Sequence, residues 1–101
     1  MSGEYQTFSQ FYPFYLSGHS TRWCRRLHYA GSLLVIVSLL TFVITRYWPW
    51  LIAVPICGYG FAWIGHFFFE RNKPATFKYP LYSLMGDWVM FWNILMGKIE
   101  V

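Results

Sequence analysis

Two long apolar stretches of equal length dominate the chain, at 27–45 and 51–69. Their only charged or imidazole side chains are His28, near the start of the first stretch, and His66, near the end of the second. A helix needs about 20 apolar residues to cross a bilayer, which is close to the length of each stretch. Because only residues 46–50 separate the two stretches, we expect an antiparallel pair of transmembrane helices.

Shorter apolar segments flank this pair. Residues 5–16 are aromatic and uncharged, and Pro13 starts or kinks the interfacial helix that we expect there. Residues 81–99 are apolar apart from a few polar positions, one of which, Asp87, can begin a helix. That helix, over 88–96, is too short to span a bilayer. We therefore expect an interfacial or re-entrant helix, with a third span as the alternative.

The composition is that of a membrane protein. Hydrophobic residues make up 56% of the chain and charged residues only 12%, against roughly 45–50% and 25% in soluble domains. Disordered chains are poor in apolar residues, so disorder is excluded. Aromatic residues, at 24%, suit contact with a lipid interface. We expect a single membrane domain over 1–101, an all-α integral membrane helical hairpin with interfacial or re-entrant helices at both ends.

Basic residues are distributed unevenly around the two stretches. Arg46 alone lies in the turn, whereas all the other cations lie on the outer flanks. These flanking cations are Arg22, Arg25, Arg26, Arg71, Lys73, Lys78 and Lys98. The split predicts that both termini face the cytoplasm. Because the cations flank apolar stretches, we relate the net charge of +4 to topology and to membrane lipid headgroups, and we expect no nucleic-acid partner.

The two cysteines, Cys24 and Cys57, are expected to be free thiols. In a hairpin that turns near Tyr47, Cys24 lies more than twice as far from the turn as Cys57 does. The difference corresponds to about 20 Å along a helix. A disulfide requires Cα atoms within about 7 Å of each other.

The three histidines, His19, His28 and His66, occupy levels that a hairpin would bring together. His28 and His66 are equally far from Tyr47 along the chain, so an antiparallel pair places them at one depth. His19 precedes the first long helix and can fold back to that level. Each transmembrane histidine shares a helix face with residues at spacings of three and four. Gly31, Val35 and Ser38 follow His28, whereas Gly58 and Ala62 precede His66 and Glu70 follows it.

Ionisable residues within a membrane are costly and indicate a functional site. Three imidazoles suit zinc, iron or copper, and the absence of a closely spaced cysteine pair argues against structural zinc. We expect His28 and His66 to point into one pocket between the two helices, with Glu70 at its mouth. The third ligand beside these two histidines is either His19 or Glu70. One iron with three protein ligands would leave positions for a chelating substrate and dioxygen. The alternative is that the histidines only anchor the helices.

Two motifs resemble a known family. The stretch 65–77, GHFFFERNKPATF, is similar to the signature of the 2-hydroxy fatty acid dioxygenases, which are named for the metabolism of phytosphingosine to odd-numbered fatty acids. Upstream, an aromatic segment with two spaced histidines resembles the second motif of that family. Its matching residues are Tyr15, His19, Arg26, His28 and Gly31. The resemblance covers residues 12–84.

The resemblance implies an Fe(II)-dependent dioxygenase that shortens a 2-hydroxy fatty acid by one carbon, with dioxygen as co-substrate. It implies His19, His28 and His66 as the metal ligands. Glu70 and Asn72 match motif positions and are candidate catalytic residues.

The location and partners of such an enzyme are further expectations from the chain itself. We expect a bacterial cytoplasmic membrane, or the endoplasmic reticulum membrane in a eukaryote, and leave a homo-oligomer open. Arg25, Arg26 or Lys73 would pair with the substrate carboxylate or with lipid headgroups. The rival function is a non-enzymatic small membrane subunit or a lipid-binding protein.

Overall fold

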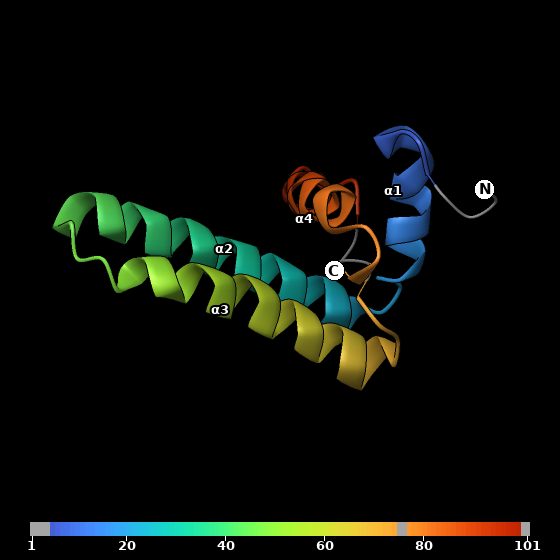
Figure 1. Ribbon diagram of the computed structural model, residues 1–101. Helices are drawn as coiled ribbons and strands as arrows, with labels where there is room; N and C mark the ends of the chain where they lie inside the picture. Colours follow the sequence, from blue (N-terminus) through green and yellow to red (C-terminus); the bar gives the residue numbers. More distant parts are fainter. Residues whose placement is uncertain (1–4, 75–76, 100–101) are drawn as a thin grey trace.

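Helices make up most of the structure, a computed structural model that describes residues 5–74 and 77–99 (Figure 1). The elements are, in chain order, α1 (Phe8–Ser17), α2 (Arg22–Thr45), α3 (Trp50–Ile64), the π-helical segment η1 (Gly65–Glu70) and α4 (Pro80–Leu95). Neither described range contains a β-strand. The expected all-α fold is therefore confirmed.

A long antiparallel hairpin of α2 against α3 and η1 dominates the molecule (Figure 1). Two helical spans, Arg22–Thr45 and Trp50–Glu70, are long and apolar enough to cross a membrane, with mean hydropathies of 2.1 and 1.5. A core helix of a soluble protein can be equally apolar, but it is mostly buried. In these spans only 22% and 17% of the most apolar windows are buried. Their apolar side chains point outward, as helices in lipid require.

Glycines let the two helices of the hairpin approach closely. A Cβ atom added to Gly31 on α2 would lie 2.8 Å from the carbonyl oxygen of Cys57 on α3. A Cβ atom on Gly65 would lie 3.1 Å from both the Cα and the Sγ atoms of Cys24. Small residues at such contacts are typical of helix pairs in membranes. Gly31 therefore sets the distance between the helices.

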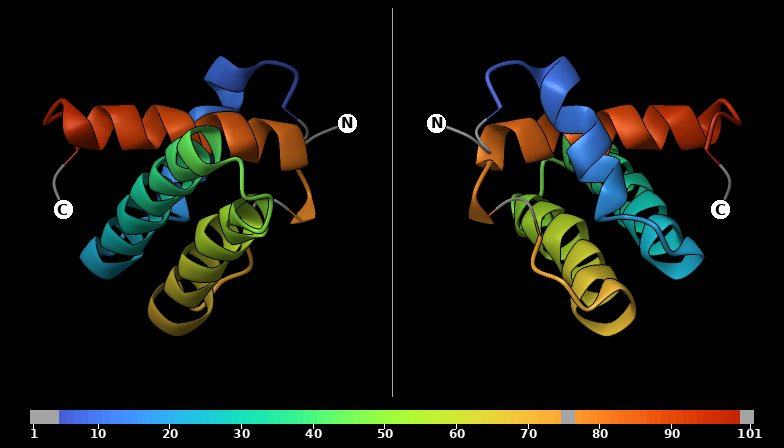
Figure 2. Two further views of the ribbon diagram at one scale, coloured as in Figure 1. Left: turned by 90° about the vertical axis from the view of Figure 1, so that its left-hand side faces the viewer. Right: turned by 90° about the vertical axis from the view of Figure 1, so that its right-hand side faces the viewer.

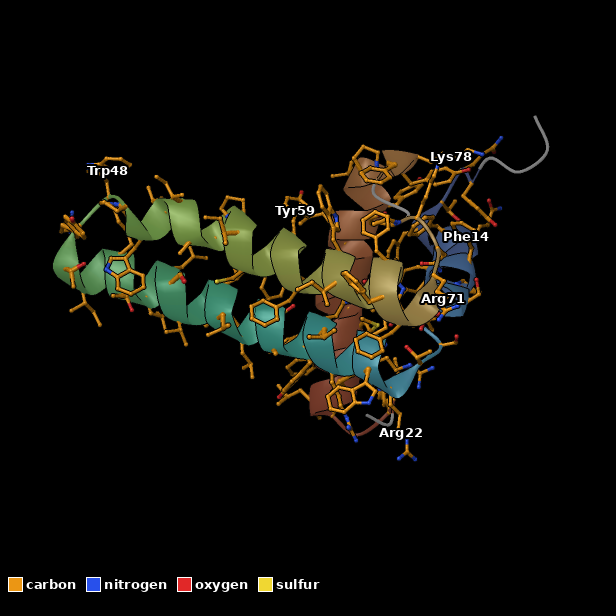
Figure 3. All side chains as sticks on the ribbon, turned by 90° about the horizontal axis from the view of Figure 1, so that it is seen from below. Phe14, Arg22, Trp48, Tyr59, Arg71 and Lys78 are labelled. Atoms are coloured by element: carbon orange, nitrogen blue, oxygen red, sulfur yellow. The ribbon has the colours of Figure 1, made fainter. Side chains whose placement is uncertain are left out.

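The register of the hairpin differs from one centred on Tyr47. Gly31 on α2 contacts Cys57 on α3. The number of residues from Gly31 to the end of α2 at Thr45 is twice the number from the start of α3 at Trp50 to Cys57. The end of α2 accordingly projects beyond the start of α3 at the turn (Figures 1 and 3). The non-helical residues of the turn return along this projecting end of α2. Counting residues from Tyr47 cannot reveal such a shift in register.

The cysteines are both free, as expected. Cys24 packs on Gly65 and Cys57 packs on Gly31, so about two turns of α2 separate their levels. That separation is about 10 Å, half of the expected value but still too long for a disulfide.

The polar end of the hairpin lies opposite its turn. In Figure 3, Arg22, Arg71 and Lys78 are at the end near α1, and Trp48 is at the other end. The described ends of the chain also lie toward the end near α1 (Figure 1). The cytoplasmic orientation of this end remains a prediction.

Helices α1 and α4 pack together beside this polar end. Figure 2 shows α4 lying across the hairpin, with α1 against it. Their shared core consists of Phe11, Tyr15, Met90 and Ile94. The Asn93 amide also donates to the Tyr12 hydroxyl oxygen at 2.7 Å, and the Tyr82 hydroxyl donates to the Gln6 carbonyl at 3.0 Å.

The start of α4 corrects the expectation that a helix begins at Asp87. The helix begins at Pro80, and Asp87 lies in its interior. Proline is favourable in the first turn because its φ angle is already helical and its missing N–H has no intrahelical partner there. The earlier start also extends the buried stripe of α4. This stripe consists of Ser83, Gly86, Met90 and Ile94.

We predict that Gly31→Ala destabilises the hairpin by about 1–3 kcal/mol, the usual cost of overpacking. The added methyl group would overlap the backbone of α3, which cannot rotate away as a side chain could. The measurement is thermal unfolding of the purified protein in detergent.

Gly60→Ala is the matched control, because a Cβ atom at Gly60 meets no described atom within 4 Å. Alanine favours a helix over glycine by about 1 kcal/mol at either position, so the difference between the variants isolates the contact. Equal melting temperatures for the two variants would contradict the close approach at Gly31.

Candidate metal centre

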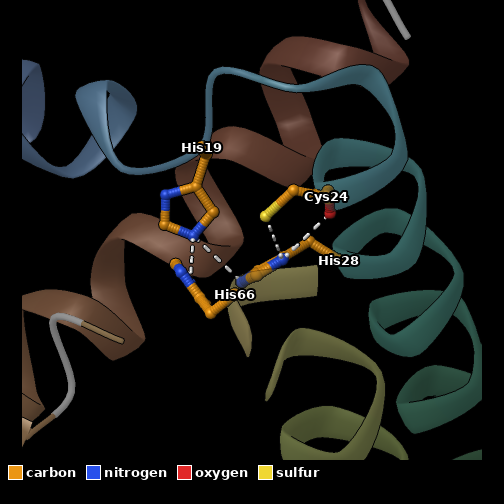
Figure 4. Close-up of side chains that lie close together, drawn as sticks. All are labelled: His19, Cys24, His28 and His66. Atoms are coloured by element: carbon orange, nitrogen blue, oxygen red, sulfur yellow. Dashed lines mark hydrogen bonds between the residues drawn. The ribbon is translucent and has the colours of Figure 1, made fainter. Parts of the chain in front are cut away.

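Three histidine rings meet where the loop after α1, the start of α2 and η1 come together (Figure 4). The Nε2 atom of His19 lies 3.0 Å from Nε2 of His28 and 3.0 Å from Nε2 of His66. The ring centroids of His28 and His66 are 5.2 Å apart. All three side chains are buried. The structure thus brings together the three histidines that the sequence singled out.

His28 and His66 meet although their backbones are not at one depth. Gly65 lies opposite Cys24, so His66 joins the hairpin about 7 Å from the level of His28. Side chains on a helix lean toward its N-terminus. In an antiparallel pair these directions are opposed, so the two rings lean toward each other and close the gap.

His19 is fixed by both neighbouring helices. Its N–H donates to the Leu16 carbonyl at 3.0 Å, and its ring stacks on Tyr15 with the centroids 4.1 Å apart. The guanidinium of Arg25 on α2 donates to the His19 carbonyl at 2.7 Å. The loop after α1 therefore holds its histidine in one orientation.

Each histidine has an acceptor for its other ring nitrogen. Nδ1 of His19 lies 2.6 Å from the Tyr15 carbonyl oxygen, and Nδ1 of His28 lies 3.1 Å from the Cys24 carbonyl oxygen. Nδ1 of His66 lies 2.7 Å from Oδ1 of Asn72. Carbonyl oxygens only accept hydrogen bonds, so the proton of each neutral ring is on Nδ1. The unprotonated Nε2 atoms, with their lone pairs, face one another.

Three such lone pairs suit a single cation. Burial, and then the His28 and His66 rings, lower the pKa of His19 to about 2, so this ring stays neutral. With no proton between them, the Nε2 atoms gain nothing from being 3.0 Å apart. Two nitrogens at about 2.1 Å from one metal ion, at right angles, are about 3.0 Å apart. The observed spacing thus fits a shared metal ion.

Cys24 also lies in this cluster, which sequence analysis missed. Its Sγ atom and the three histidines offer ligand atoms within 4.8 Å of one another. The thiol is 3.8 Å from Nδ1 of His28, on the protonated side of that ring. The Nε2 atoms of His28 and His66 both lie 3.0 Å from Nε2 of His19, which makes these three nitrogens the better-placed donors.

The structure places the two other predicted residues differently. Asn72 is at the centre, where it orients His66 and donates from Nδ2 to the Gly18 carbonyl at 3.3 Å. Glu70 instead accepts hydrogen bonds from the Ser20 hydroxyl and the Thr21 N–H, at the start of α2. A helix N-terminus favours such a negative charge.

The expectation that Glu70 stands at the mouth of the histidine pocket therefore stays a prediction, whereas its carboxylate is hydrogen-bonded to the start of α2. From Gly65 onward the chain is π-helical, so four residues no longer complete a turn. His66 and Glu70 both lie in this segment, and the Glu70 carboxylate is directed toward the start of α2.

Helix α4 adds two polar residues that sequence analysis did not assign to the site. Asp87 accepts a hydrogen bond from the Tyr15 hydroxyl, and its Oδ1 lies 3.9 Å from Nε2 of His28. Burial raises the pKa of Asp87 to about 6, although this hydrogen bond opposes the shift. Ser83, one turn earlier, is 1% exposed, and its hydroxyl has no hydrogen-bond partner among the described residues. Their spacing of four in an apolar segment was the available signal.

A small cavity joins these groups. Its walls include the three histidines, Ser83 and Asp87. An unpaired hydroxyl in a buried cavity is unfavourable unless a polar ligand or water occupies it. The cavity is therefore suited to a polar group beside the histidines.

The basic residues considered for a carboxylate differ in their placement. Lys73 lines a second cavity together with His19, His66 and Asn72. Arg26 instead lies over the ring of Trp23, 4.9 Å from its centroid.

The fold and site define a class, a helical hairpin of membrane type with a buried three-histidine centre. A family model described as Mpo1-like, 2-hydroxy-palmitic acid dioxygenase Mpo1-like, matches residues 5–99. The chain therefore belongs to this family, and the family resemblance of its motifs is confirmed. No curated protein and no solved structure matches the chain significantly.

We predict that Asn72→Leu lowers metal affinity by about 10–100-fold, the usual effect of removing a partner that orients a ligating histidine. His66 would lose the acceptor that holds its proton on Nδ1. Affinity for Fe(II) is measured anaerobically by competition with a chelator.

Asn72→Asp is the matched control, because it keeps an acceptor oxygen for Nδ1. His28→Ala, which removes a donor atom, should abolish high-affinity binding while the helical circular dichroism signal stays unchanged. Full metal affinity in Asn72→Leu would mean that the orientation of His66 does not matter for binding.

Proposed function

We propose that the chain is a membrane-embedded Fe(II)-dependent dioxygenase that shortens 2-hydroxy fatty acids by one carbon. The observation that carries this proposal is the convergence of three unprotonated Nε2 atoms beside a cavity with an unpaired hydroxyl. His19, His28 and His66 are the proposed iron ligands, with His19 rather than Glu70 as the third. The family name supports both the reaction and the substrate class.

The substrate suits the polar groups around the histidines. A 2-hydroxy acid carries a carboxylate next to a hydroxyl group, which together form a chelating pair. Ser83 would donate to an oxygen of this pair, and Asp87 would accept from its hydroxyl group. Tyr15 holds the Asp87 carboxylate in place for that contact.

The overall reaction balances with dioxygen as the only oxidant. The C1–C2 bond breaks, C1 leaves as carbon dioxide, and C2 becomes the carboxyl carbon of the shorter acid. The substrate loses four electrons, which reduce dioxygen, and one water molecule is the remaining product. Bound iron supplies the one-electron chemistry through which dioxygen reacts with a closed-shell acid. The protein's part is to orient the acid and to exclude bulk water.

A membrane location follows from the hairpin and from the substrate. The outward apolar surface of α2 and α3 would contact lipid, and α1 and α4 would lie near its interface. Either a bacterial cytoplasmic membrane or the endoplasmic reticulum membrane would supply the acid. The rival is a non-enzymatic subunit or lipid-binding protein that uses the same hairpin.

We expect protein reconstituted with Fe(II) to convert 2-hydroxyhexadecanoic acid to pentadecanoic acid under air, as measured by mass spectrometry. Hexadecanoic acid, which lacks the 2-hydroxyl group of the chelating pair, should remain unchanged. Bound iron without any turnover of 2-hydroxy acids would favour the rival.

A second prediction concerns Ser83→Ala, whose effects on stability and on binding should have opposite signs. The melting temperature should stay or rise, because the hydroxyl is buried without a partner at a cost of about 1–3 kcal/mol. The KM for the 2-hydroxy acid should rise roughly tenfold, through loss of a hydrogen bond to a charged group.

Ser38→Ala provides the comparison. Its hydroxyl already donates to the Leu34 carbonyl at 2.7 Å and lies on α2 away from the histidines. We expect no change in KM there. An unchanged KM in Ser83→Ala would remove this residue from the substrate site.

A further inference from the structure

An apolar groove begins at the histidine centre and runs along the hairpin. It has a volume of about 300 Å³, and α2, α3 and α4 all line it. On α2 it extends from His28 past Val35 to Leu39. On α3 it passes Gly58 and reaches Val54.

The groove and the small cavity share walls. His28 and Asp87 line both of them. One end of the groove is therefore polar and adjoins the convergent Nε2 atoms, whereas the remote end is apolar. A ligand that occupies both spaces would therefore carry a polar head and an apolar tail.

The length of the groove matches a fatty acyl chain. His28 and Leu39 are about three turns apart on α2, or about 16 Å. An extended chain advances about 1.2 Å per bond, so this length holds about 13 carbon atoms. The groove is also open at its edge, because Leu39 is 42% exposed and Leu84 on α4 is 50% exposed. A chain could enter sideways from lipid.

We propose that this groove binds the acyl chain of the substrate and that its remote end, at Leu39 and Val54, limits the chain length. The proposal rests on the proposed function for the identity of the polar head. It assigns Gly58 and Val54 as specificity-determining residues, with Gly58 nearer to the centre. Bulk at these two positions should therefore shorten the accepted chain by different amounts.

The matched variants lie on a single helix. Val54→Phe fills the remote end, whereas Ile56→Phe adds the same ring to a residue that is 64% exposed and outside the groove. Gly58→Leu fills the middle beside Val35, and Gly60→Leu makes the same change at a position with no described atom within 4 Å. Each control variant shows how much the added side-chain volume alone affects folding and activity.

We expect Val54→Phe to lower kcat/KM for 2-hydroxyhexadecanoic acid roughly tenfold or more, because several methylene groups lose their buried site. The value for 2-hydroxyoctanoic acid should stay unchanged. Gly58→Leu should also reject 2-hydroxydodecanoic acid. Ile56→Phe and Gly60→Leu should keep the wild-type order of substrates. Equal losses for all chain lengths in Val54→Phe and Ile56→Phe would overturn the proposal.

A second measurement does not depend on turnover. A 2-hydroxyhexadecanoic acid with a terminal diazirine should label peptides that contain Leu39 or Val54, and Val54→Phe should abolish that labelling. Labelling spread evenly over the outward faces of α2 and α3 would show bulk lipid contact and overturn the groove. Groove labelling without turnover of any acid would overturn the proposed function and support the chain site alone.

Discussion

The arrangement of protons on three imidazole rings is the constraint on which the rest of the structure depends. Each Nδ1 atom has an oxygen acceptor, from Tyr15, Cys24 or Asn72, so each Nε2 atom is left with a lone pair. Lone pairs that face one another across 3.0 Å are unfavourable without a cation between them. The folded chain therefore holds a set of donor atoms whose spacing suits a single metal ion.

Several elements are needed to satisfy that constraint. The loop after α1 supplies His19, the hairpin supplies the other two rings, and the residues after η1 supply the Asn72 acceptor. Helix α4 then closes the remaining side with Ser83 and Asp87. The aromatic core between α1 and α4 and the glycine contacts between α2 and α3 keep these elements at fixed distances. Their packing thus serves the centre as well as stability.

Sequence patterns predicted correctly those properties that depend on a single helix. The apolar stretches predicted the hairpin, because spanning length and hydrophobicity are properties of a segment. The stripe through His28, Gly31 and Val35 predicted the buried face of α2, because helical periodicity is local. The same reasoning could not assign the partners of the Glu70 carboxylate, because Ser20 and Thr21 lie in a distant segment of the chain. It was wrong for the start of α4, where burial against α1 extends the helix back to Pro80.

By itself, the sequence determined the class of fold, the choice of the three histidines as candidate site residues, and the family. Composition, residue spacing and sequence motifs depend only on the order of residues in the chain. The tertiary structure alone decided the overhang of α2 at the turn, the tautomer of each ring, and the addition of Ser83 and Asp87 to the centre. These depend on contacts between residues that are distant in the chain, such as Gly31 with Cys57 and Tyr15 with Asp87. Only packing in three dimensions brings such residues within reach of one another.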